Sequence, residues 1–535
     1  MKVRRLATWT ALPLTLALGL AACGSGGGSE TGGSSDVIVR QGIGDPEHLV
    51  PTNVVESNGS DVLNALFTPL VKFDANGKVT FEGAAAESIT TTDNKVWTVK
   101  LKDGFTFHNG EKVTAQNYID AWNYGAYGPN AQIGTDFFSR IEGYEDLQST
   151  DGAQPKAKEM SGLKKVDDLT FTVTLSKPFA EWQKVMGYNV FLPMPKAAFA
   201  DMEAYEKAPI GQGPFKMKGE WERDKQIETE RYEAYPLAKP KIKGVLFKIY
   251  ADYETEYNDL LAGNLDIMTQ LPSTRLASAK TELGDRMKTT PSSYFAWLTV
   301  PSYSPQFKNP DLRKALSMAI DRDAIVEKIF AGAYTPAHSW VSPIVDGARP
   351  DTCGEACEFN PAKAKELYER SGGLPGNKLA IYYNADGGHK EWVDAVANQL
   401  RNNLGIDATG QPVAKFAELR QQARAHTLEG LLRGAWSFDY PSMENYLTPL
   451  MRTGGSSNDS QYSNPEFDRL LEEGDTAPTP EEAIKKYQAA EDLIAKDLPL
   501  IPLWFKQNIY GHSANVKNVE LDLFTHVDLL KVEAA

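Results

Sequence analysis

Strand signals and helix signals alternate along this chain from Asp36 onward, and this alternation limits the fold more than any other feature. Trp97, Val99 and Leu101 alternate with polar residues, so the pattern predicts a strand with one buried face. A helical period follows directly, and Thr114 is its predicted N-cap. The same change from the two-residue pattern of a strand to the helical pattern of apolar residues recurs toward the end of the chain. Alternating strands and helices predict an α/β architecture.

Several further helices have recognisable ends. Asn309 and Pro310 combine an N-cap with a proline at the first helical position, and Asp321 caps the next helix. Gly405 is expected to end one helix, and Thr479 to begin another. The 535 residues are too many for one simple core, so we expect two or three packed units. Further half-buried strands are expected at 169–175 and 245–249.

The N-terminal 35 residues differ from the rest. Basic residues precede an apolar stretch that is too short for a comfortable membrane span, and this stretch ends at Leu20-Ala21-Ala22-Cys23. That ending resembles the bacterial lipobox, in which a lipid is attached to the cysteine and the chain is cleaved before it. The alternative is a plain secretory signal with an incidental cysteine. We predict a lipoprotein signal peptide at 1–22, and a lipidated Cys23 with a flexible Gly/Ser tether at 23–35.

The charge of the chain limits its partners. The formal net charge of −15 argues against a nucleic-acid phosphate backbone as a partner. It fits a secreted protein that stays soluble, and we expect a monomer. We expect the protein on the extracytoplasmic face of the cell membrane, held there by the lipid at Cys23 and not by a membrane span.

Five stretches, taken together, carry a family resemblance. They are LFTPL at 66–70, the segment 86–114 with GFTFHNG at 104–110, IGQGPF at 210–215, DLRKALSMAIDRDAIVEKIFAG at 311–332, and WSFDYP at 436–441. In this order they resemble motifs of the extracellular solute-binding proteins of family 5, which include oligopeptide- and dipeptide-binding proteins. Gln212 departs from the threonine that is commoner in the third motif.

The resemblance implies a fold and a domain organisation. The fold would be α/β, a bilobed type II periplasmic-binding-protein fold with an extra subdomain in the first lobe. Lobe I would comprise 36–65, 185–285 and 500–535, and the extra subdomain would comprise 66–184. Lobe II would comprise 286–499.

The resemblance also implies a function. The protein would be the extracellular substrate-binding component of an ABC importer. It would capture oligopeptides in the cleft between its lobes and deliver them to the permease subunits in the membrane. The implied protein is not an enzyme and needs no cofactor.

Asp439 is the predicted centre of the ligand site. In the oligopeptide-binding members, the aspartate of the W-x-x-D-Y motif pairs with the α-ammonium group of the peptide. An enclosed ammonium group loses its water, and a nearby carboxylate offsets that loss. The residue-level alternative is an aspartate in a surface turn before Pro441.

The neighbours of Asp439 are further candidates. Trp436 and Tyr440 could form an aromatic wall of the pocket, and Ser437 is also a candidate ligand contact. Regular strand alternation would place Ser437 and Asp439 on one face of the strand. It would place Trp436, Phe438 and Tyr440 on the opposite face. Both sets can line one cleft only where the segment is irregular. The alternative is that the aromatic residues belong to the core of lobe II.

The remaining chemistry-bearing residues give weaker signals. Cys353 and Cys357 are close enough for a local disulfide outside the cytoplasm, and a metal site there would need more ligands. The seven histidines show no metal-binding spacing, so no metal is expected. No nucleophile motif is present, although the many carboxylates leave a glycosidase pair open.

Other functions remain open at this stage. The same fold could bind dipeptides, oligosaccharides or a metal chelate. A secreted lipoprotein hydrolase is the alternative from a different class. A surface receptor for a peptide pheromone would differ from the importer only in the events after binding.

Overall fold

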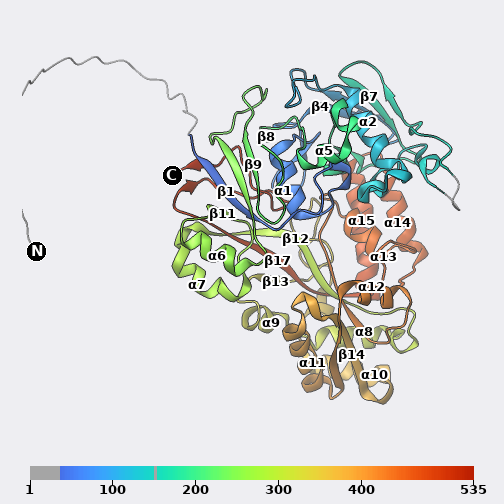
Figure 1. The fold of residues 1–535 in the computed structure, drawn as a ribbon. Helices are drawn as coiled ribbons and strands as arrows, with labels where there is room; N and C mark the ends of the chain where they lie inside the picture. The colour runs from blue at the N-terminus through green and yellow to red at the C-terminus, as the bar shows by residue number, and fades with distance from the viewer. Residues whose placement is uncertain (1–35, 150–153) are drawn as a thin grey trace, which may run out of the picture. The chain divides into compact units, whose positions relative to one another are not determined.

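The structure, a computed structural model, describes residues 36–149 and 154–535. The predicted signal peptide, the predicted lipidation site at Cys23 and the tether lie outside these residues. Within the described ranges, no helix combines the length and the apolar character that crossing a bilayer requires. Figure 1 shows how the elements are arranged.

Strands from distant parts of the chain share one large sheet. Among the described residues this sheet has 11 strands. β1 is parallel to β10 and β11, and β14 is parallel to β15 and β16, as expected for an α/β architecture. The strand order is β15 (Asp407–Val413), β14 (Lys378–Asn384), β16 (Leu431–Trp436), β12 (Met287–Thr299), β17 (Leu500–His512), β11 (Ile267–Met268), β1 (Ile38–Ile43), β10 (Gly244–Ile249), β9 (Gln226–Arg231) and β8 (Phe215–Met217), with β13 (Tyr334–Pro336) paired to β17.

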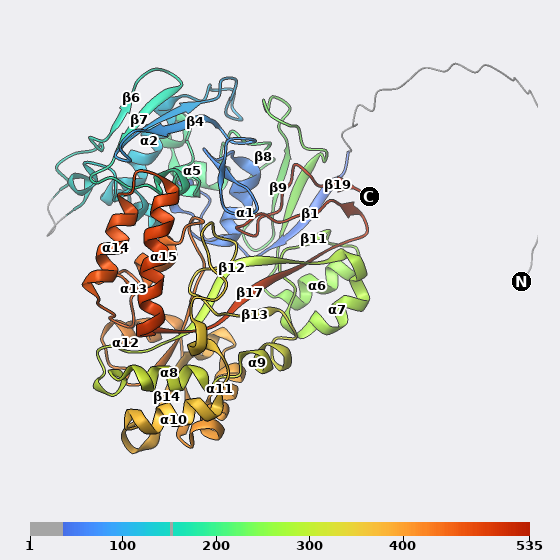
Figure 2. The same cartoon turned by 180° about the vertical axis from the view of Figure 1, so that it is seen from behind.

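Two long antiparallel strands, β12 and β17, join the two ends of this sheet. They lie side by side in both views (Figures 1 and 2). β12 also pairs with β16, and β17 also pairs with β11. Their ladder contains a bulge, in which Ser292 to Tyr294 of β12 stand opposite a single residue of β17, Lys506. A bulge of this kind bends the strand and redirects side chains.

The end of the sheet that contains β1 and β10 packs against two groups of buried side chains. One combines β1, β10 and α1 with the C-terminal segment 516–532. The other lies among α6, α7 and the end of β17. The elements here are α1 (Ser57–Leu66), α6 (Tyr253–Leu261), α7 (Leu276–Leu283), and the short strand pairs β2 (Lys72–Phe73) with β3 (Val79–Thr80) and β18 (Val516–Lys517) with β19 (Glu533–Ala534).

A separate core lies on a four-stranded antiparallel sheet of order β4-β5-β7-β6. Trp122 of α2 is fully buried there, and its ring contacts Phe138, Phe171 and Phe191. This core extends beyond the predicted subdomain boundary at 184 and includes Tyr205. Its elements are β4 (Ala86–Thr91), β5 (Val96–Leu101), β6 (Leu163–Lys165), β7 (Thr170–Thr174), α2 (Ala115–Ala126), α3 (Trp182–Val185), α4 (Lys196–Ala200) and α5 (Met202–Lys207).

The part between β12 and β17 packs in two large cores and a small cluster around Leu419 of α12. The first lies under α8 to α11, and the second contains α13, α14 and α15. Cys353 and Cys357 are joined by a disulfide, with their Cα atoms 5.6 Å apart. The helices are α8 (Pro310–Met318), α9 (Arg322–Lys328), α10 (Pro361–Ser371), α11 (Lys390–Leu404), α12 (Phe416–Arg424), α13 (Glu444–Met451), α14 (Pro465–Asp475) and α15 (Pro480–Asp497).

The predicted helix ends are confirmed. Thr114 is the N-cap of α2 and forms a capping box. Asn309 and Asp321 accept hydrogen bonds from backbone N–H groups in the first turns of α8 and α9. Gly405 follows α11 with a left-handed φ of 74°. The division into lobes remains a prediction, and we note that Ile501 of β17 packs in the α8–α11 core.

Candidate functional site

Distant parts of the chain line a cavity of about 920 Å³, which we call the cleft. One set of lining residues comes from α1 and the loop after it. A second set comes from the bulge of β12 and the middle of β17. The loop after β16 and the C-terminal segment 520–531 supply further sets, and single residues such as Tyr188 and Gln270 complete the lining. A cavity of this size is within the range of ligand-binding sites.

Asp439 lines the cleft from the loop after β16. Its backbone N–H donates to Asn445 Oδ1 at 2.8 Å, and its Oδ2 accepts from Asn445 Nδ2 at 3.3 Å. Burial raises the pKa of Asp439 to about 6, although the Asn445 hydrogen bond acts in the opposite direction. Among the described residues, its carboxylate has a neutral amide as its hydrogen-bonding neighbour and no cation in an ion pair.

Strand β16 ends at Trp436, so the segment after it does not alternate regularly. Ser437, Phe438 and Asp439 therefore line the same cleft. Trp436 is half-buried and packs against the α13–α15 core instead. The structure thus brings the predicted Ser437 and Asp439 together and adds Phe438 to them.

Tyr440 lies outside the cleft. It is 8% exposed and packs in the core that contains Trp122. Its hydroxyl donates to Glu444 Oε2. Glu444 also pairs with Arg140 at 3.2 Å, so this tyrosine joins an ion-pair network between the four-stranded-sheet region and α13. This placement assigns Tyr440 to packing rather than to the cleft wall.

Lys506 is a cleft residue that sequence reasoning missed. It lies in the middle of β17 opposite the bulge of β12. Its Nζ donates to Gln270 Oε1 at 2.9 Å, and Gln270 lines the same cleft. The available signal was a lysine that directly follows the apolar run Leu500 to Phe505. A charged residue in a buried central strand needs a partner or a role.

The C-terminal segment 520–531 brings aromatic and charged groups to the cleft. Phe524 contacts Phe438 at a ring-centroid distance of 5.3 Å and Phe73 at 5.8 Å. Burial opposes the charge of His526, but the Asp522 carboxylate outweighs it and raises the pKa of His526 to about 9. The cleft therefore contains an imidazolium group that is already paired with a carboxylate.

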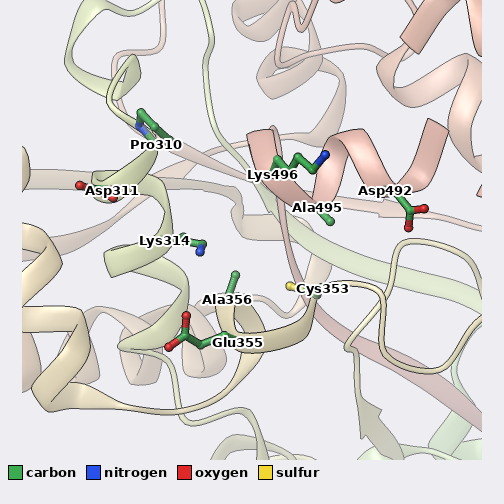
Figure 3. A pocket seen from close by; sticks show the side chains of 9 residues that line it. All are labelled: Pro310, Asp311, Lys314, Cys353, Glu355, Ala356, Asp492, Ala495 and Lys496. Carbon is green, nitrogen blue, oxygen red and sulfur yellow. The ribbon is translucent and has the colours of Figure 1, made fainter. Parts of the chain in front are cut away.

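A second cavity, of about 600 Å³, lies among α8, the disulfide loop and α15 (Figure 3). Its acidic residues are paired with cations. Asp311 lies 2.8 Å from Arg370, and Asp492 lies 2.8 Å from Arg349. Because these carboxylates are compensated, they attract a ligand cation less than the Asp439 carboxylate of the cleft does.

Two residues of the sequence motifs have structural contacts. Gln212 is buried, accepts from the Thr68 N–H and donates to the Thr68 carbonyl at 2.8 Å, so it fixes a loop. His108 accepts a hydrogen bond from the Gly211 N–H at 3.1 Å, and burial lowers its pKa to about 4. In the part of the chain that the structure describes, no group of three His, Cys, Asp or Glu side chains is arranged to hold a metal ion.

Comparisons with known proteins agree with this architecture. Residues 80–458 match the model of the bacterial extracellular solute-binding proteins, family 5 Middle. The chain is 26% identical to the oligopeptide-binding protein OppA of Bacillus subtilis, over 95% of both chains. It is 25% identical to heme-binding protein A of Haemophilus influenzae, over 86% of this chain and 85% of that protein. The unliganded open form of the murein tripeptide binding protein MppA matches with a TM-score of 0.80 and 22% identity, over 93% of this chain and 97% of that one. The α/β binding-protein fold predicted from the sequence is thereby confirmed.

Proposed function

Because the chain belongs to family 5 of the bacterial extracellular solute-binding proteins, we propose that it captures oligopeptides for an ABC importer. Proteins of this family are extracytoplasmic solute-binding components of ABC importers and are not enzymes, and this chain is such a component. The peptide ligand is the proposal. The relative named oligopeptide-binding protein, which matches over 95% of the chain, supports it.

The Asp439 carboxylate carries the proposal. It lies in the wall of the cleft, it is largely removed from water, and a neutral amide is its hydrogen-bonding neighbour. A buried carboxylate without a cation is unfavourable, so a ligand cation that reaches it is bound strongly. The α-ammonium group of a peptide is such a cation. The resemblance of residues 436–441 to the family motif supports the same role for Asp439.

The rest of the peptide can bind with little sequence preference. An extended peptide can pair with main-chain groups of the receptor, and water can fill roomy side-chain pockets. Closure of the lobes about β12 and β17 would then enclose the ligand, and the permease would recognise the closed form. We also propose that a lipid at Cys23 keeps the receptor at the membrane.

Calorimetric titration tests the peptide proposal. The chain from Ser34 onward is unfolded and refolded to remove bound ligand, and is then titrated with a mixed peptide library at neutral pH. We expect binding that weakens by about ten-fold or more in Asp439→Asn and after N-acetylation of the peptides. Asp407→Asn, which changes an exposed aspartate on β15, is the matched control and should bind as the parent does.

The other outcomes point to other ligands. If no peptide binds the refolded parent, the peptide proposal is wrong and the fold assignment stands. Heme, oligosaccharides and metal chelates would then be titrated, heme first because one matched relative is named a heme-binding protein. Peptide cleavage during the titration would instead support the hydrolase alternative.

A further inference from the structure

Lys506 is a cation of the cleft wall that forms no ion pair with any described residue. Burial lowers its pKa, and no nearby carboxylate offsets this effect. Its hydrogen-bonding partner is the neutral side chain of Gln270. Among the described residues, no carboxylate lies within ion-pair distance of its Nζ. A half-buried ammonium group in this setting is unfavourable until an anion reaches it.

Two other basic groups of the cleft are paired with carboxylates, whereas Lys72 of β2, like Lys506, has no ion pair with a described residue. Lys531 lies 2.6 Å from Glu520 and 3.5 Å from Asp528. His526 is paired with Asp522 at 3.6 Å. These cations are already compensated, so a ligand anion gains less from them than from Lys506.

The backbone around Lys506 points to a built site. The bulge places three residues of β12 opposite this one residue of β17. Ser292 Oγ donates to the Lys506 carbonyl at 2.9 Å, which fixes the strand there. Bulges are common beside functional sites because they redirect side chains. Gln270 accepts from Lys506 through its oxygen, and its amide N–H groups remain available as donors beside the ammonium group.

Lys506 and Asp439 are complementary within the one cleft. Each is desolvated, and each is held by a neutral carboxamide, from Gln270 and Asn445 respectively. They come from different elements, β17 and the loop after β16. The pair favours a ligand that carries an ammonium group and a separate anionic group.

We propose that Lys506 and Gln270 form a subsite for a carboxylate of the ligand. This inference rests on the proposed peptide function and goes beyond it, because it names a second charged recognition point. Lys506 Nζ donates to one carboxylate oxygen, and the Gln270 amide donates to the other. The carboxylate is either the C-terminus of a short peptide or an acidic side chain of a longer one.

Peptide chemistry separates these two sources. A peptide with neutral side chains is titrated as the free acid and as the C-terminal amide, and a C-terminally amidated peptide with one glutamate is titrated beside them. If the subsite takes the C-terminus, amidation weakens binding to the parent by about thirty-fold. If it takes an acidic side chain, the glutamate peptide binds more tightly than its glutamine counterpart by a similar factor.

The variants test whether Lys506 is responsible. In Lys506→Met the preference for the carboxylate should disappear, and in Lys506→Arg it should persist. Lys288→Met, at an exposed position of β12, is the matched control and should keep it. The comparison of ligands on the parent protein needs no variant, so it holds even if a variant folds poorly.

Each result decides between the two proposals. Peptides that bind through their amines, with equal affinity as acid, amide and glutamate forms, overturn the carboxylate subsite and leave the peptide function intact. The subsite is also overturned if Lys506→Met keeps the full carboxylate preference. If no peptide binds the parent, the proposed function fails and the subsite fails with it.

Discussion

Peptide affinity should fall about ten-fold when the pH is lowered from 7 to 5. Burial raises the pKa of Asp439 to about 6 in the free protein. The peptide ammonium group stays protonated over this range, because its own pKa is near 8 by the usual reference values. The ionised fraction of Asp439 therefore falls from about 0.9 to about 0.1, and only the ionised form can pair with the ammonium group.

The direction of proton exchange on binding depends on the same carboxyl group. In the complex the ammonium group lowers the pKa of Asp439, so binding below pH 6 must release a proton. Calorimetry in two buffers of different ionisation enthalpy measures this release, with close to one proton expected at pH 5. The nearby His526 has a pKa of about 9 and stays charged across the range, so it adds little.

Asp439→Asn separates this effect from other titrating groups. The variant should bind weakly at both pH values, with no ten-fold change between them and no proton release. Equal parent affinities at pH 5 and 7 would refute the reasoning, and so would an unchanged pH slope in the variant.

Two further predictions concern stability. Burial raises the pKa of Asp61 to about 7 and that of Glu256 to about 8, and the pKa of His526 is raised to about 9 by Asp522 against the effect of burial. Each of these pKa values is higher in the folded state than in the unfolded state, so the folded protein binds protons more tightly. The free energy of unfolding therefore decreases as the pH rises through these values. Thermal unfolding should show a decrease of more than about 2 kcal/mol from pH 6 to 9, and a rise would contradict it. Arg140→Met should cost about 3 kcal/mol in denaturant unfolding, because it leaves Glu444, only 2% exposed, without its cation. Adding Glu444→Gln should recover most of this loss, and a double variant no more stable than the single one would argue against the ion pair.

Residues 436–441 show how far the sequence leads at the site. The motif indicated Asp439 and Ser437, and both line the cleft because they follow the end of β16. Tyr440 belongs to the core that contains Trp122 instead, and the carboxylate that accepts from its hydroxyl pairs with Arg140, 304 positions away in the chain. Long-range packing decides such contacts, and no local pattern encodes it.

Lys506 shows where the sequence falls short. The helix caps at Thr114 and Asn309 were predictable because capping depends on a few neighbouring residues. The partner of Lys506, Gln270, lies 236 positions away in the chain. The bulge opposite it depends on the register of two distant strands. Only the assembled sheet reveals that this lysine is a cleft residue.

The pairing of β12 with β17 also limits when the large sheet can form during synthesis of the chain. β17 comes near the end of the chain, yet it lies between β12 and β11 in the sheet. Until residues 500–512 have emerged from the ribosome, both ends of the sheet lack their shared neighbour. The large sheet therefore stays incomplete, with unpaired edges on β11 and β12, until nearly all of the chain has been synthesised. A chain that stays incomplete for so long is well suited to export in an unfolded form, since the last segment to appear is the one that closes the sheet.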